Sequence, residues 1–156
     1  MSMVVDLGPI VKTVDVRRSA AEAFRIFTEE VSAWWPMTHT RARSAQGEIA
    51  VRVTIEPCVG GRVFETLQDG RELDWGTVSA FEPGAMFAMV WSLGRPVAQA
   101  TDVSVRFEPL GPKATRVTLV HEHWQRMGEE AKQREGYAGG WATVFEQAFK
   151  AYADQA

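Results

Sequence analysis

Apolar and polar residues alternate in short runs over most of the chain, which predicts β-strands separated by turns. Residues 11–17 form the first run, and a period of two is typical of a half-buried strand. Six further runs lie at residues 51–55, 62–67, 72–81, 86–91, 101–110 and 114–124. Asp69 and Gly70 give a strong hairpin signal between two of them. Strands this closely spaced indicate an antiparallel meander.

Two helices are expected between the first strand and the second. Ser19 and Glu22 match the S-x-x-E capping box that opens a helix, and apolar residues then recur on one helical face. The run "VSAWW" predicts a second short helix that ends at Pro36. Residues 36–48 are mostly polar and are expected to form a loop.

The last segment, residues 129–153, changes to a period of about 3.6 and predicts a long helix. Its apolar stripe consists of Tyr137, Trp141, Phe145, Ala148, Phe149 and Tyr152. Gly136, Gly139 and Gly140 are poor residues for a helix interior, each costing about 1 kcal/mol relative to alanine. They indicate a kink, a helix start near Gly140, or a close approach of the helix backbone to the sheet.

The order of elements predicts an α+β fold in one domain over residues 1–156. It consists of a strand, two helices, about six strands and a long helix. An antiparallel sheet with one apolar face needs a layer that covers it, and only the last helix is long enough. We therefore expect a curved sheet of about six or seven strands to wrap around that helix, with a space between them.

Composition and charge narrow the expected partners and location. Hydrophobic residues make up 46% of the chain and charged residues 24%, and the net charge of -3 includes no basic cluster. We therefore expect no nucleic-acid partner and no membrane partner. The start of the chain, "MSMVVDLGPIVKTVDV", carries no visible export signal, so a cytoplasmic location is expected. A single cysteine, Cys58, excludes an internal disulfide and a cysteine-based zinc cluster.

Six short motifs in order resemble one known family. They are "SAAEAFRIFT", "WWP", "EPCVGGRVFE", "DWGTVSAFEPGAMFAMVW", "TRVTLVHEH" and "GW". From about residue 11 to 153 they resemble the START-like superfamily, also called SRPBCC or helix-grip, and within it the activators of the heat-shock protein 90 ATPase. The resemblance implies a helix-grip fold with a lipophilic cavity. The superfamily includes lipid carriers, small-molecule receptors, aromatic-polyketide cyclases and co-chaperone domains, so the fold does not choose the function.

The segment "VTLVHEHW" carries His121 and His123, which are expected to share the helix-facing side of a strand. Two imidazoles need a third metal ligand, and the remaining histidine, His39, lies in a distant loop. No metal site is therefore predicted. Both histidines are either partly solvated strand-end residues or, for His121, a polar group of the cavity. The resemblance favours the second role for His121, because the family commonly carries histidine there.

Glu65 has two interpretations, because the turn after Gly61 leaves the parity of its strand open. If Val63 points inward, the Glu65 carboxylate enters the cavity and needs an arginine, a histidine or a raised pKa. A pair of Glu65 and His121 would then either orient a ligand hydroxyl or act as an acid–base couple. If Phe64 points inward instead, Glu65 is a solvated surface residue.

Six tryptophans and eight phenylalanines supply apolar rings for a cavity wall. The residues expected to contact a ligand are Trp35, Glu65, Trp75, Met89, Trp91, His121, His123, Trp141 and Phe145. We expect a small soluble protein that binds a hydrophobic molecule, aromatic or lipid-like, between the sheet and the last helix. No catalytic residue and no cofactor is predicted, since the chain lacks a nucleophile elbow, a P-loop and a dinucleotide motif.

Two other functions stay open at this point. One is an enzyme of the cyclase or hydratase type, in which His121 and Glu65 must lie within hydrogen-bonding reach. The other is a co-chaperone-like module that binds another protein through a contiguous exposed apolar patch. The sequence favours a binding protein over both, and it leaves the oligomeric state open, with a homodimer among the allowed states.

Overall fold

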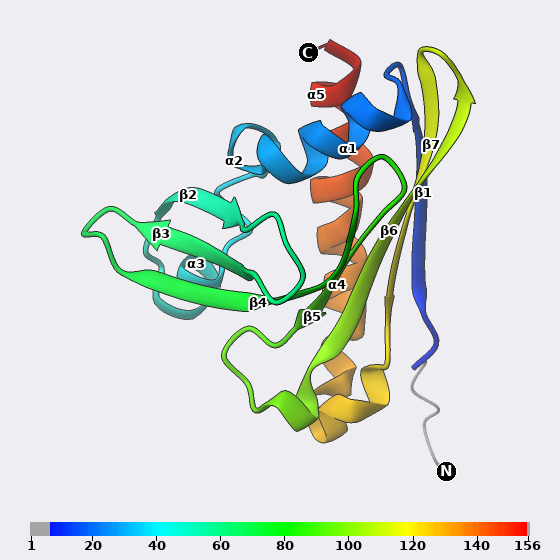
Figure 1. The fold of residues 1–156 in the computed structure, drawn as a ribbon. Coiled ribbons are helices and arrows are strands. Elements are labelled where there is room, and N and C mark those ends of the chain that lie inside the picture. The colour runs from blue at the N-terminus through cyan, green and yellow to red at the C-terminus, as the bar shows by residue number, and fades with distance from the viewer. Residues whose placement is uncertain (1–6, 156) are drawn as a thin grey trace.

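The computed structural model describes residues 7–155, apart from the side chains of residues 44–46 and 129. Seven antiparallel strands form one curved sheet in the order β1-β7-β6-β5-β4-β3-β2 (Figure 1). They are β1 (Ile10–Val16), β2 (Ala50–Ile55), β3 (Arg62–Leu67), β4 (Glu72–Glu82), β5 (Met86–Trp91), β6 (Thr101–Gly111) and β7 (Ala114–Glu122). Strands β2 to β7 follow one another as the predicted meander, and β1 pairs with β7.

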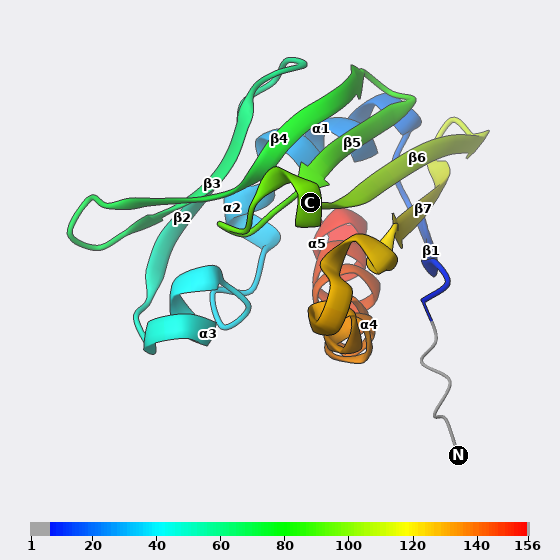
Figure 2. The same ribbon diagram turned by 90° about the horizontal axis from the view of Figure 1, so that it is seen from below.

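Helices lie between β1 and β2 and after β7. They are α1 (Ala20–Glu29), α2 (Val31–Trp34), α3 (Arg41–Gln46), α4 (Arg134–Trp141), a π-helical segment (Ala142–Phe149) and α5 (Lys150–Gln155). The last three form one continuous C-terminal helix that runs along the concave side of the sheet (Figures 1 and 2). The predicted α+β helix-grip fold is therefore confirmed. No helix of the described residues is long and apolar enough to cross a bilayer.

The main core fills the space between the sheet and the C-terminal helix. Along β7, Val117, Leu119 and His121 are buried, while the residues between them are partly exposed. On the helix, Phe145 and Phe149 are buried, and their rings stack with 5.6 Å between centroids. The period-two face of the strand and the predicted apolar stripe of the helix therefore pack against each other.

The start of α1 agrees with its sequence signal. Ser19 Oγ accepts a hydrogen bond from the backbone N–H of Glu22 at 3.2 Å. This bond satisfies one of the donors that the first turn of a helix leaves without a partner. The Ser19 hydroxyl also donates to the Glu22 carboxylate at 3.0 Å, so both residues of the predicted capping pattern take part.

The segment predicted to be a loop, residues 36–48, contains the additional helix α3. Thr40 Oγ1 caps this helix by accepting a hydrogen bond from the N–H of Arg43 at 3.3 Å. Gly47 ends it in the left-handed conformation, with φ = 68°. The prediction of two helices between the first two strands is therefore wrong, because a cap and a terminating glycine stabilise a third, polar one.

The C-terminal helix also differs from its prediction. It begins at Arg134 rather than at residue 129, because the preceding chain, Trp124–Gln133, is 3₁₀-helical and is broken at Gly128. Gly136, Gly139 and Gly140 lie inside α4, and a Cβ atom at any of them would meet nothing within 4 Å. The helix therefore neither starts near Gly140 nor brings its backbone close to the sheet there.

Replacing Ser19 with alanine tests the cap of α1. We expect the free energy of unfolding to fall by about 1 kcal/mol, since one N–H of the first turn loses its acceptor. Ser19→Asp is the matched control, because aspartate also caps helices and should keep most of the stability. Urea unfolding followed by circular dichroism measures both variants, and equal losses for alanine and aspartate would contradict the assignment.

Candidate functional site

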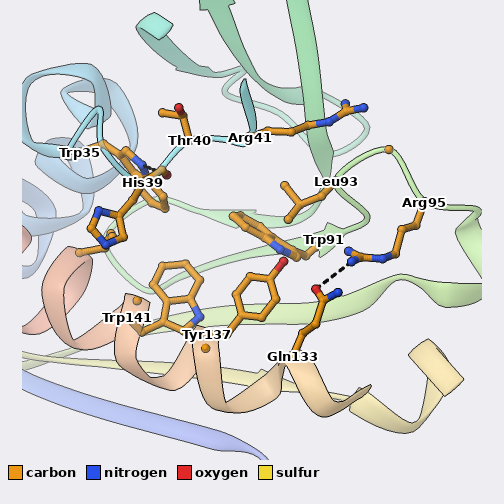
Figure 3. Close-up of a pocket in the computed structure, with 14 residues that line it drawn as sticks. Trp35, His39, Thr40, Arg41, Trp91, Leu93, Arg95, Gln133, Tyr137 and Trp141 are labelled. Carbon is orange, nitrogen blue, oxygen red and sulfur yellow. Dashed lines mark hydrogen bonds between the residues drawn. The ribbon is translucent and has the colours of Figure 1, made fainter. Parts of the chain in front are cut away.

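A pocket lies between the C-terminal helix, the chain that follows β5 and the chain that leads into α3 (Figure 3). Its volume is about 820 Å³, within the range of roughly 300–1,000 Å³ typical of small-molecule sites. Its lining residues are Trp35, His39, Thr40, Arg41, Trp91, Leu93, Gly94, Arg95, Gln133, Gly136, Tyr137, Gly140, Trp141 and Val144. The pocket is thus built from three segments that are far apart in the sequence.

Four aromatic side chains form much of the wall. Trp141 meets Trp35 edge-on, with 5.8 Å between ring centroids and an angle of 87° between ring planes. Trp91, the last residue of β5, lies 5.8 Å from Trp141 and 6.4 Å from Tyr137, again between centroids. Figure 3 shows these rings around a common space. Because each ring packs against another, the wall is formed before a ligand arrives.

The indole N–H groups of the three tryptophans have different partners. Trp35 Nε1 donates to the carbonyl of His39 at 2.9 Å, and Trp141 Nε1 donates to His121 Nδ1 at 3.0 Å. Trp91 is only 7% exposed, and within the described part of the chain its N–H has no acceptor. A buried donor without a partner costs roughly 1–3 kcal/mol.

Two glycines form the part of the wall that α4 contributes. Gly136 and Gly140 are four residues apart and therefore lie on one face of the helix, and both line the pocket. A Cβ atom at either position would meet nothing within 4 Å. The glycines therefore keep a strip of helix surface free of side chains, and the pocket occupies that space.

Positively charged and neutral polar residues complete the lining. Arg95 Nη2 donates to Gln133 Oε1 at 2.8 Å, and it lies 3.9 Å from the carboxylate of Glu130. Arg41 Nη1 donates to the main-chain carbonyl of Asp74 at 3.0 Å. The lining contains no aspartate and no glutamate. Polar recognition in this pocket therefore comes from donors more than from acceptors.

His121 lies behind the wall rather than in the pocket. It is fully buried, and its Nδ1 accepts the hydrogen bond from Trp141, since an indole N–H can only donate. The ring proton is therefore on Nε2, which donates to Thr101 Oγ1 at 2.7 Å. Burial lowers the pKa of His121 to about 3, so the ring is neutral. Its role is to hold the Trp141 ring in place.

Glu65 is buried, so its interpretation as a solvated surface residue is wrong. The parity of β3 is decided by an irregularity in its pairing with β4, between Val63 and Phe64. Oε1 accepts hydrogen bonds from the N–H of Arg41 at 2.6 Å and from Trp75 Nε1 at 2.5 Å. Oε2 accepts from the N–H of Ala42 at 3.0 Å.

The Glu65 carboxylate therefore fixes the first turn of α3 to the sheet. Three donors stabilise its charge, which takes the place of the arginine or histidine that burial was expected to require. No hydrogen bond joins Glu65 to His121 among the described residues, and both groups are already bonded to other partners. The direct contact between Glu65 and His121 that would suit the alternative enzyme function is therefore not formed.

His123 does not share a strand face with His121, so that prediction is wrong. β7 ends at Glu122, and the backbone of His123 turns into the left-handed region with φ = 71°. The imidazole instead bonds to Asp102 through Nδ1 at 2.5 Å, on the opposite side of the sheet. Among the described residues, no group of three histidine, cysteine or acidic side chains could hold a metal ion.

Three of the nine residues expected at the site line the pocket, namely Trp35, Trp91 and Trp141. Trp75, Met89 and Phe145 are buried in the core, and Glu65, His121 and His123 have the structural contacts described above. Parity identified inward-facing rings correctly. Parity could not distinguish a ring that packs in the core from a ring that lines the pocket. That difference depends on which residues of the C-terminal helix lie opposite the ring.

Sequence reasoning missed the lining residues at the start of α3 and just before it, those in the chain after β5, and several in and next to the C-terminal helix. These are His39, Thr40, Arg41, Leu93, Gly94, Arg95, Gln133, Gly136, Tyr137, Gly140 and Val144. One signal was available: Gly136 and Gly140 recur at helical spacing beside Tyr137 and Trp141. Small residues repeated on the apolar face of a helix indicate space next to that face.

The family model described as Activator of Hsp90 ATPase homolog 1-like protein matches residues 17–154. No curated protein matches the chain.

Several solved structures share the fold. The anthrahydroquino-gamma-pyrone synthase Txn09, complexed with SUM, is 28% identical with a TM-score of 0.65, over 97% of this chain and 99% of its own. The self-sacrificing resistance protein CalC from Micromonospora echinospora is 25% identical with a TM-score of 0.66, over 96% of each chain. The Aha1 dimer from Colwellia psychrerythraea has a TM-score of 0.67 over 94% and 96% of the two chains, and at 17% identity it shows the fold alone.

The buried neutral state of His121 predicts how stability depends on pH. The unfolded chain binds a proton at this histidine below its ordinary pKa of about 6.5, whereas the folded chain does not until about pH 3. Stability therefore falls as the pH decreases from 6.5, and this residue contributes a loss of about 2 kcal/mol between pH 7 and pH 5.

The measurement is urea unfolding at pH 7 and pH 5 for the wild type and for His121→Gln. Glutamine can still accept from Trp141 and donate to Thr101, but it does not titrate. We expect the variant to lose about 2 kcal/mol less than the wild type over this interval. His39→Gln is the control and should keep the wild-type dependence, since His39 is exposed and its ring bonds to the neutral hydroxyl of Thr38. Identical losses in all three proteins would refute the assignment.

Proposed function

The chain belongs to the family of Activator of Hsp90 ATPase homolog 1-like proteins, and on this premise we propose that it binds a small aromatic molecule in the pocket beside Trp141. The fold of this family, shared with polyketide-cyclase-like relatives, is that of a small ligand-binding domain. The proposal adds the kind of ligand and its place between the C-terminal helix, the chain after β5 and the chain before α3.

The observation that carries the proposal is the strip of bare backbone at Gly136 and Gly140. Glycine inside a helix costs about 1 kcal/mol relative to alanine, and alanine at either position would meet no other atom within 4 Å. The stability of the helix would therefore be higher with a side chain at both positions. The two glycines instead leave space in front of Trp91 and Trp141, and a ligand ring can occupy it.

The chemistry of the wall supports an aromatic ligand over an alkyl chain. Trp35, Trp91, Tyr137 and Trp141 present rigid rings at angles to one another, and aromatic rings pair favourably in tilted and edge-on arrangements. The likeness to Txn09, a synthase of a fused aromatic pyrone by its name, supports the same class. Affinity would come from apolar surface removed from water, at about 25 cal/mol per Å².

The hydrogen bonding of Glu65 and His121 supports binding rather than acid–base catalysis by this pair. The lone pair of His121 Nδ1 accepts from Trp141, and the carboxylate oxygens of Glu65 accept from three donors of the protein itself. Neither residue lines the pocket. A ligand in the pocket would therefore meet the groups that these two residues hold in position, and not the residues themselves.

The exposed apolar side chains support the pocket over a protein-docking surface. The large ones are dispersed over both edge strands, the end of β6 and several connecting segments, and they are Leu7, Val11, Ile49, Val51, Val59, Val97 and Leu110. Val11 lies on β1 and Val51 on β2, at opposite edges of the sheet. A co-chaperone-like module needs its apolar residues together. A homodimer stays a prediction, which light scattering of the purified protein would test.

Filling the glycine strip tests the pocket directly. N-phenylnaphthylamine, a neutral aromatic probe that fluoresces when bound in an apolar site, should bind the wild type. Gly140→Leu places a side chain in the pocket and should weaken binding by about tenfold or more, equivalent to at least about 1.4 kcal/mol. The variant should remain folded and gain stability, since leucine is a far better helix former than glycine.

Gly139→Leu is the matched control. It lies on the same helix, its Cβ would also meet nothing within 4 Å, and it does not line the pocket. Its helix gains the same propensity, but its probe affinity should equal that of the wild type. Loss of binding in both variants, or in neither, would show that the probe does not occupy this pocket.

A further inference from the structure

We propose that the ligand of this pocket is an anion: an aromatic molecule whose acidic group is bound by Arg41 and Arg95. This inference rests on the proposed function, because it names the ligand class of the same pocket. Three observations carry it, namely the charge of the lining, the position of the two arginines and the position of Trp91 between the aromatic wall and those arginines.

The first observation is the sign of the charge in the lining. Arg41 and Arg95 line the pocket together with His39, and no acidic residue does. Within the described residues Arg41 forms no ion pair, and its one side-chain hydrogen bond goes to a neutral carbonyl, that of Asp74. A guanidinium has five donors, so most of those on Arg41 are left for another acceptor.

The second observation is that both arginines lie at one side of the pocket. A Cβ atom on Gly94 would be 2.3 Å from Arg41 Nη2, so the Arg41 guanidinium lies directly against the residue that precedes Arg95. Gly94 has φ = 82°, a backbone conformation that residues other than glycine rarely adopt. Figure 3 shows both arginines on the side of the pocket away from Trp35 and His39.

One acidic residue, Glu130, forms an ion pair with one of these two cations, Arg95. Glu130 lies outside the lining, 3.9 Å from Arg95, and its side chain is about half-exposed. Ion pairs between partly exposed groups at such distances contribute little, roughly 0–1 kcal/mol. The guanidinium of Arg95 is also oriented by Gln133, which accepts from Nη2. An arginine held in this way is prepared for a carboxylate or a similar acidic group.

The third observation is the position of Trp91. Its ring is part of the aromatic wall, and Figure 3 shows it between Trp141 and Arg95. The aromatic wall and the cationic side of the pocket therefore meet at this residue. A ligand ring that packs against the tryptophans would direct its acidic group toward the arginines.

Two probes that differ by one acidic group test the inference. Anilinonaphthalene sulfonate is the sulfonate of N-phenylnaphthylamine, and both report binding by fluorescence. We expect the sulfonate to bind the wild type about tenfold more tightly than the neutral compound. Its affinity should also fall as the salt concentration rises, whereas that of the neutral probe should not.

Single substitutions identify the side chains responsible. Arg41→Gln and Arg95→Gln should each weaken sulfonate binding by about fivefold while leaving N-phenylnaphthylamine binding unchanged. Arg106→Gln is the matched control, since Arg106 is an exposed arginine on β6 that does not line the pocket. Gly140→Leu should reduce the binding of both probes, which shows that they share this site.

The outcomes separate the two proposals. If both probes bind equally and the arginine variants bind the sulfonate as the wild type does, the anionic ligand is refuted while the aromatic pocket stands. If neither probe binds, or if Gly140→Leu leaves both affinities unchanged, the proposed function itself fails and this inference fails with it.

Discussion

The hydrogen bond from Trp141 Nε1 to His121 Nδ1 joins the C-terminal helix to the sheet, and the shape of the pocket depends on it. Both groups are buried where water cannot replace either partner, so the bond fixes the rotation of the helix as well as the ring. An indole N–H only donates, which requires a neutral imidazole with its proton on Nε2. Thr101 Oγ1 accepts a hydrogen bond from this Nε2 proton. The indole, the imidazole and the hydroxyl are thereby joined in one hydrogen-bonded series. The Trp141 ring is thereby held against Trp35 and Trp91.

Glu65 has the equivalent role on the other side of the pocket. Its carboxylate accepts from two backbone N–H groups at the start of α3 and from Trp75, so a buried charge positions a short helix that packing alone would hold weakly. Arg41, whose backbone N–H is one of those donors, lines the pocket. Both walls are therefore placed by buried polar groups that do not themselves line the pocket, and preorganised sites are supported in this way.

The sequence predicted the parts of this arrangement that depend on local periodicity. Alternation in β7 correctly placed His121 toward the helix, because nothing interrupts that strand before Glu122. It failed at His123, where a left-handed turn ends the strand, and it left the parity open at Glu65, whose strand pairs irregularly with β4. The lining from α3 was not foreseen either. That helix is stabilised by a carboxylate more than twenty residues away, and no local pattern contains such a contact.

The glycines of α4 distinguish a pocket that is kept open from a core that is incompletely filled. A poorly packed core gains stability from larger side chains, and at Gly136 and Gly140 an added Cβ atom would meet nothing within 4 Å. Without side chains at these two positions, the helix is less stable than it could be. The glycines lie next to aromatic rings and arginines that line the same pocket. Binding sites commonly contain residues that lower the stability of the folded protein. Glycines in a helix beside aromatic rings and hydrogen-bond donors fit this description. It follows that a ligand which fills this strip should stabilise the folded protein.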